Sequence, residues 1–199
     1  MIIFLTSIVN QLVCSQETID SYAIMFNSGV GSLPYPFQFT VTRNQENITI
    51  DYKKKTKTYY RRIKRNKEIK EFINAPTQAQ SEDQKNRIIE LHDKYSKYKH
   101  ASVSIDSNRF PSYFYLADSI FQSDLQTTGK DLIKKGMVLL DGSVTEIKVI
   151  RSDSTSNSLW IHSALVKKSP LISRFIYETL QMYERINNRP FIESGFNLK

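Results

Sequence analysis

Alternation of apolar and polar residues between positions 37 and 52 is the feature that most limits how this chain can fold. In FQFTVTR, every second residue from Phe37 to Val41 is apolar, and in ITIDY the same is true from Ile48 to Tyr52. A period of two residues is typical of strands with one buried face. With the polar turn NQEN between them, the two segments predict an antiparallel hairpin over residues 37–52.

Three later segments also predict strands. ASVSID alternates in the same way, and MVLL-DG-SVTEIKVI predicts a hairpin, because Asp141-Gly142 is a pair typical of a type I′ turn. After the polar linker SDSTSNS, LWIHSALV predicts a further strand. Within the basic stretch that follows Tyr52, we expect KKKTK to form a turn and TYYRRI to form a short strand.

Other segments place apolar residues at helical spacing. Residues 17–28, ETIDSYAIMFNS, predict a helix that ends at Gly29. KEIKEFIN predicts a helix that ends before Pro76, and Ser81 caps a longer helix, SEDQKNRIIELHDKYSKYK. SYFYLADSIFQS and PLISRFIYETLQMYERINN predict helices, the second beginning at Pro170, and GKDLIKKG predicts a short helix or turn.

Helices and antiparallel strands in separate runs predict an α+β fold, an antiparallel meander sheet with helices packed on one face. The chain has 199 residues, of which 40% are hydrophobic, so it is long enough to bury a core without disulfides. We expect residues 16–199 to form a single domain.

Residues 1–15 resemble a signal peptide that lacks its basic front part. The apolar run IIFLTSIV is too short to cross a bilayer, and Val13 and Ser15 occupy the small-residue positions of a cleavage site before Gln16. We therefore expect a secreted or periplasmic protein whose mature chain has no transmembrane helix. The alternative is a buried first strand or helix. The single cysteine, Cys14, lies within this segment, so a cleaved chain would have no disulfide.

The positive charge of the chain is concentrated in residues 53–70, which contain ten Lys or Arg residues and one acid, Glu68. Outside this stretch the chain has 18 basic and 19 acidic residues, although the whole chain carries a formal charge of +8. A partner attracted by charge should therefore bind one region of the surface. The candidate binding residues are Lys53, Lys54, Lys55, Lys57, Tyr59, Tyr60, Arg61, Arg62, Lys64 and Arg65.

Three interpretations of this basic stretch are open. Its lysines could protect a sheet edge from pairing with other chains. They could bind an acidic protein, an anionic polysaccharide or a lipid surface. Tyrosines interleaved with arginines would also suit nucleic acid, but an exported protein seldom meets nucleic acid, which makes this partner the less favoured one.

The sequence contains no recognisable catalytic pattern. His92, His100 and His162 are the only histidines, and no nucleophile elbow, metal-binding spacing or phosphate-binding loop accompanies them. We therefore expect no metal and no cofactor. Trp160 and His162 alternate along a predicted strand, so they share one face and are a candidate pocket, or else edge packing.

These observations favour an exported, non-catalytic binding protein whose basic stretch contacts an anionic partner or surface. The alternative is a secreted hydrolase or nuclease with a dispersed site around His162, for which His92 and Glu146 are the other residues to inspect.

Overall fold

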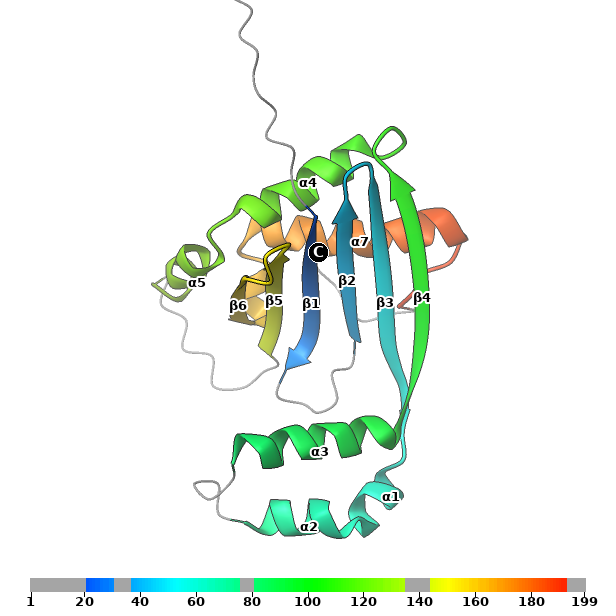
Figure 1. Cartoon of the computed structure of the whole chain (residues 1–199), viewed down its shortest axis with the longest axis vertical. Helices are drawn as coiled ribbons and strands as arrows, with labels where there is room; N and C mark the ends of the chain where they lie inside the picture. Colours follow the sequence, from blue (N-terminus) through cyan, green and yellow to red (C-terminus); the bar gives the residue numbers. More distant parts are fainter. Residues whose placement is uncertain (1–20, 31–36, 76–80, 135–143, 193–199) are drawn as a thin grey trace, which may run out of the picture.

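The computed structural model describes residues 21–30, 37–75, 81–134 and 144–192. Six strands form one antiparallel sheet in the order β4-β3-β2-β1-β5-β6 (Figure 1). The strands are β1 Tyr22–Val30, β2 Phe37–Asn44, β3 Asn47–Thr58, β4 Ser96–Asp106, β5 Val144–Arg151 and β6 Ser156–His162.

The helices form two groups. The first consists of α1 Tyr60–Arg65, α2 Lys67–Asn74 and α3 Glu82–Lys94, which lie between β3 and β4 in the chain. The second consists of α4 Pro111–Gln122, α5 Leu125–Lys134, α6 Ser163–Val166 and α7 Pro170–Asn187. The second group supplies the helical side chains of the main core, and α7 crosses behind the strands in Figure 1. The predicted α+β fold, with an antiparallel sheet and helices against one face, is confirmed.

Aromatic rings fill the space between the sheet and α7. Phe26 and Phe39 stack at 4.8 Å between ring centroids, and the edge of Phe175 meets Phe39 at 5.9 Å. All three side chains are at most 1% exposed. Each large aromatic ring removes much apolar surface from water, so this contact gives α7 a fixed position across the strands.

The first predicted hairpin is confirmed. β2 and β3 pair in register, with Val41 opposite Ile50, and the turn between them places Gln45 at a φ of 45°. The helices predicted from 67, 81, 112 and 170 are confirmed as α2, α3, α4 and α7. At the start of α3, the Ser81 hydroxyl accepts from the Gln84 N–H, and the Gln84 side chain accepts from the Ser81 N–H. This reciprocal cap explains why Ser81 marks the first turn.

The helix predicted over residues 17–28 is wrong, because Tyr22–Val30 forms β1. Tyr22, Ile24 and Phe26 also fit a period of two, and all three face the core. β1 pairs with β2 on one side and β5 on the other, so hydrogen bonding to two strands decides between the two periodicities.

The turn and strand predicted within the basic stretch are also wrong. β3 continues through the segment KKKTK to Thr58, and YRRIKR forms α1. The helix predicted from Ser81 is shorter than expected, because α3 ends at Lys94 and residues 96–100 belong to β4. Both differences have one cause, since the second half of β3 pairs with the first half of β4.

Two predictions fall partly or wholly on residues that the structure does not describe. The signal segment 1–15, with Cys14, is one. Of the hairpin around Asp141-Gly142, only its second strand is described, as β5, which pairs with β1 and β6.

The strand predicted for LWIHSALV ends at His162, and the last four residues of this segment form α6. Among the described residues, no helix is long and apolar enough to cross a membrane.

The helices α1, α2 and α3 form a separate unit, which we call the helical arm. It lies at the opposite end of the strands from α4 in Figure 1. Ile63, Ile69, Ile88 and Leu91 make its own small cluster of buried side chains, distinct from the main core. The arm is therefore held together by its own apolar contacts and joined to the sheet through β3 and β4.

Candidate functional site

The candidate site lies where the sheet meets the helical arm. Here residues 53–58 of β3 pair with residues 96–100 of β4, and we call this two-stranded segment the neck. A register shift between Lys55 and Lys57 leaves Thr56 without a partner residue opposite it. Such a bulge bends and twists the strands, which turns the neck as it leaves the sheet.

The neck continues a cross-strand ladder that is apolar inside the core. Within the core, Ile50 lies opposite Val103 and Tyr52 lies opposite Ala101. Two residues further on, the next pair on the same face is Lys54 and Lys99, and beyond the bulge Lys57 lies opposite Lys97. Like charges directly opposite each other destabilise a strand pair. The chain thus places two lysine pairs directly beyond the apolar pairs of the core.

Some neck charges have partners within the protein. The Lys53 ammonium lies 3.7 Å from an Asp93 carboxylate oxygen and 4.2 Å from the centre of the Tyr98 ring. The Tyr98 hydroxyl donates to the same carboxylate at 2.6 Å, and burial together with this bond raises the pKa of Tyr98. The Lys99 ammonium lies 5.6 Å from the Phe191 ring. These contacts fix the direction of the two lysine side chains but neutralise only Lys53.

Tyr59 directly follows the neck segment of β3, and three cations surround its ring. Its ring centre lies 5.1 Å from the Lys57 ammonium, 5.1 Å from the guanidinium carbon of Arg62 and 5.9 Å from the Lys97 ammonium. The hydrogen bond with Lys97 and the charges of all three cations lower the pKa of Tyr59. Its backbone N–H donates to the Tyr95 carbonyl at 2.8 Å, which ties β3 to the end of α3.

The remaining predicted residues lie on α1. Ile63 is buried within the small core of the helical arm. Arg61, Lys64 and Arg65 are exposed, and Tyr60 is 63% exposed. The ten predicted residues therefore divide into three places. Lys53, Lys54, Lys55 and Lys57 are on β3, Tyr59 is at the junction, and Tyr60, Arg61, Arg62, Lys64 and Arg65 are on α1.

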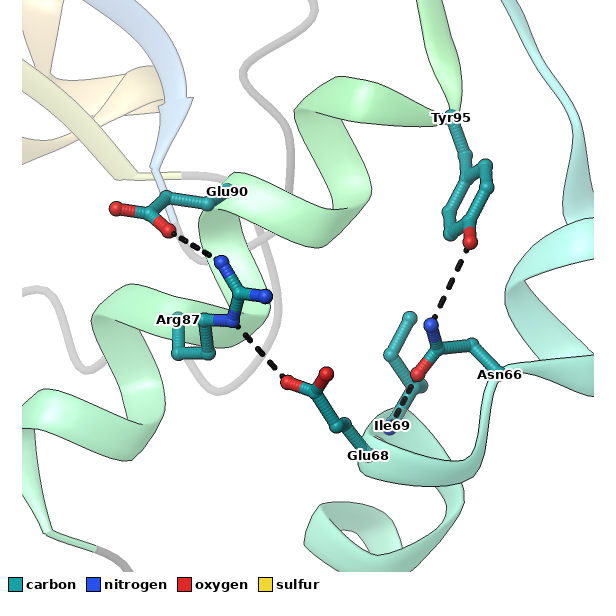
Figure 2. Close-up of polar contacts among 6 residues, drawn as sticks. All are labelled: Asn66, Glu68, Ile69, Arg87, Glu90 and Tyr95. Carbon is teal, nitrogen blue, oxygen red and sulfur yellow. Dashed lines mark hydrogen bonds and ion pairs between the residues drawn. The ribbon is translucent and has the colours of Figure 1, made fainter.

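The one acid of the basic stretch does not neutralise the neck. Glu68 accepts from the Arg87 Nε at 3.1 Å, and Arg87 also donates to Glu90 at 3.0 Å (Figure 2). Asn66 caps α2 by accepting from the Ile69 N–H at 3.1 Å, and its side-chain amide donates to the Tyr95 hydroxyl at 3.4 Å. These bonds join α2 to α3 and use the Glu68 carboxylate within the helical arm.

The predicted pocket residues Trp160 and His162 lie on β6, at the edge of the sheet opposite β4. Trp160 is 53% exposed on the edge strand β6 and lies opposite Glu146, whose carboxylate accepts from the Asn27 side chain at 2.8 Å. Two hollows of about 220 and 420 Å³ lie along α4 and α7, and neither Trp160 nor His162 lines them. The structure therefore brings the pair together on one strand but leaves its role as a pocket a prediction.

His92, on α3, has an Nδ1 atom that is buried and makes no hydrogen bond within the described structure. Burial lowers the pKa of His92, and the nearby charge of Lys55 lowers this pKa further. Among the described residues, no group of three His, Cys, Asp or Glu side chains could hold a metal ion.

Sequence reasoning missed Lys97 and Lys99 as members of the site. It assigned them to the end of a helix, where a cation suits the helix dipole. Only the register between β3 and β4 shows that they oppose Lys57 and Lys54. The sequence did hold one signal, because a strand extended from ASVSID towards the N-terminus would place Lys97 and Lys99 on the same face as Ala101 and Val103.

Comparison of the chain with protein-family models, with curated proteins and with solved structures found no match.

Proposed function

We propose that this chain is an exported, non-catalytic binding protein that contacts an anionic partner or surface through the neck and α1. The proposal rests on two cross-strand lysine pairs, Lys54 with Lys99 and Lys57 with Lys97. Their mutual repulsion disfavours the free protein, and an anion placed between them would relieve it. Charges gathered in one place also attract a partner to that place.

The partner we expect is an acidic protein, an anionic polysaccharide or an anionic lipid surface. Exposed arginines on α1 supply forked donors that match phosphate, sulfate or carboxylate oxygens, and the neck lysines add charge beside them. Nucleic acid is the less favoured partner, because the proposed export would remove the protein from it. Binding of this kind releases counterions, so it weakens steeply as salt rises.

The test is to measure binding to heparin, to phosphatidylglycerol vesicles and to single-stranded DNA at low and moderate salt. We compare the wild type with a variant in which Lys54, Lys57, Lys97 and Lys99 are changed to Gln. The matched control changes Lys130, Lys148, Lys167 and Lys168 to Gln, which removes the same charge elsewhere. The neck variant should lose affinity at least about tenfold more than the control, with a shallower salt dependence. Absence of binding at low salt, or equal losses in both variants, would reject the neck as a binding surface.

Export is tested separately. The intact mass of the protein recovered from its native host should correspond to a chain that begins at Gln16. A mature chain that still begins at Met1 would contradict export without affecting the binding experiment.

A further inference from the structure

Three cations surround the half-buried ring of Tyr59, the residue that directly follows β3. We call Lys57, Tyr59, Arg62 and Lys97 the Tyr59 cluster. The three cationic groups come from β3, α1 and β4, yet all lie within 5.1 to 5.9 Å of one ring centre. In the described part of the chain, no carboxylate forms an ion pair with any of them. The cluster is thus a concentrated positive charge rather than part of a diffuse field.

We propose that the Tyr59 cluster binds the dianionic head of a phosphate monoester. This inference rests on the proposed function and names the chemical group that the neck prefers. A phosphate monoester carries about −1.5 to −2 charge at pH 7 and three acceptor oxygens. A carboxylate or a phosphate diester carries only one negative charge, so three cations around one ring favour the monoester.

The donors of the cluster suit this group. Arg62 offers a fork of N–H donors, and Lys57 and Lys97 offer compact charges that match a small anion. The Tyr59 hydroxyl, which already shares a hydrogen bond with Lys97, adds a neutral donor to the same place. Each of these groups gains more from a dianion than from a singly charged ligand.

The backbone around the cluster is well fixed. The Thr56 hydroxyl donates to the Lys97 carbonyl at 3.1 Å, and the Thr58 and Ser96 hydroxyls lie 3.3 Å apart across the strands. Burial of Ile63 holds α1 against the other two helices of the helical arm. Arg62 directly precedes Ile63, so the same contact fixes its backbone position. The backbone positions that carry the cations are therefore fixed before the anion arrives, which lowers the entropic cost of binding.

A phosphate monoester could be the headgroup of a lipid or part of a soluble molecule. The experiment distinguishes these sources by using phosphatidic acid vesicles and free phenyl phosphate as separate probes. Phosphatidylglycerol vesicles serve as the diester control. The variants are Tyr59→Phe and Lys97→Gln. Tyr115→Phe and Lys130→Gln are the matched controls, because both residues are exposed and lie on α4 and α5, outside the neck and α1.

The pH dependence gives a second readout. The second ionisation of a phosphate monoester has a pKa near 6, so its charge grows between about pH 5 and pH 7 while that of a diester stays constant. The histidines on the elements next to the cluster are His92 on α3 and His100 on β4. A histidine gains positive charge as pH falls, so it would favour anion binding at pH 5 rather than at pH 7. Stronger binding at pH 7 than at pH 5 therefore cannot come from the histidines.

We expect the wild type to prefer phosphatidic acid over phosphatidylglycerol at pH 7 by about fivefold or more, the factor that one additional charge contact gives at a membrane surface. Lys97→Gln should bring the preference close to one, Tyr59→Phe should reduce it, and the two control variants should keep it. Competition by phenyl phosphate would assign the preference to the monoester itself, and failure to compete would assign it to the lipid surface.

Equal binding to both kinds of vesicle, or a preference that does not rise with pH, would overturn the monoester inference and leave the proposed function standing. Binding to neither kind of vesicle, to heparin or to DNA at low salt would overturn both.

Discussion

Tyr52 is the residue that ends the core ladder, and its hydroxyl is hydrogen-bonded to the backbone of α7. Its hydroxyl donates to the Thr179 carbonyl at 2.6 Å, and its ring is 1% exposed among Tyr183 and Phe191. We predict that Tyr52→Phe keeps the ring packing and loses this bond. The free energy of unfolding should fall by about 0.5–1.5 kcal/mol, measured by denaturant unfolding.

The control for this substitution is Tyr115→Phe. Tyr115 is 73% exposed on α4, so removing its hydroxyl should change the unfolding free energy by less than about 0.5 kcal/mol. Equal losses in the two variants would mean that the bond to Thr179 makes no particular contribution.

At the scale of elements, the helical arm depends on four buried aliphatic side chains. Ile69 on α2 is 1% exposed, whereas Ile73, one turn later on the same helix, is 70% exposed. We predict that Ile69→Ala destabilises the arm by about 2–5 kcal/mol, because it leaves a cavity in a very small core. Hydrogen exchange should show faster exchange across α1, α2 and α3, while β1, β2 and β5 keep their protection.

Ile73→Ala is the matched variant, and it should leave the exchange of all these elements nearly unchanged. If Ile69→Ala instead accelerates exchange throughout the sheet, the arm and the main core unfold as one unit, and the separation of their side-chain clusters has no energetic meaning.

The elements that sequence reasoning placed correctly are those with one unambiguous local signal. The alternation on both sides of NQEN predicted β2 and β3, and the cap at Ser81 predicted α3. β1 was mistaken for a helix because Tyr22 and Phe26 fit both periods, and only pairing with β2 and β5 decides between them.

The candidate site was only partly predictable for the same reason. The lysines and arginines of residues 53–65 are visible as a composition, and so the sequence located one half of the neck. Lys97 and Lys99 join it through the register of two strands that are separated by three helices. A local pattern contains no information about such a register, because it depends on how the helical arm closes the connection.

At the scale of the whole molecule, buried tyrosines link stability to alkaline pH. Burial is the largest cause that raises the pKa of Tyr22 on β1, Tyr52 on β3 and Tyr113 on α4 above the ordinary value. In the unfolded chain these groups ionise near pH 10, while in the folded protein they stay protonated, so their contribution is fully present below about pH 10 and is lost as pH rises above it.

Denaturant unfolding between about pH 8 and pH 11 should therefore show a falling free energy, by up to about 1.4 kcal/mol per pH unit for each such tyrosine. Lysines also titrate in this range, so the decisive comparison is between the wild type and Tyr52→Phe, which should lose stability less steeply. The same slope in both proteins would contradict the prediction, because it would show that Tyr52 ionises equally easily in the folded and unfolded chains.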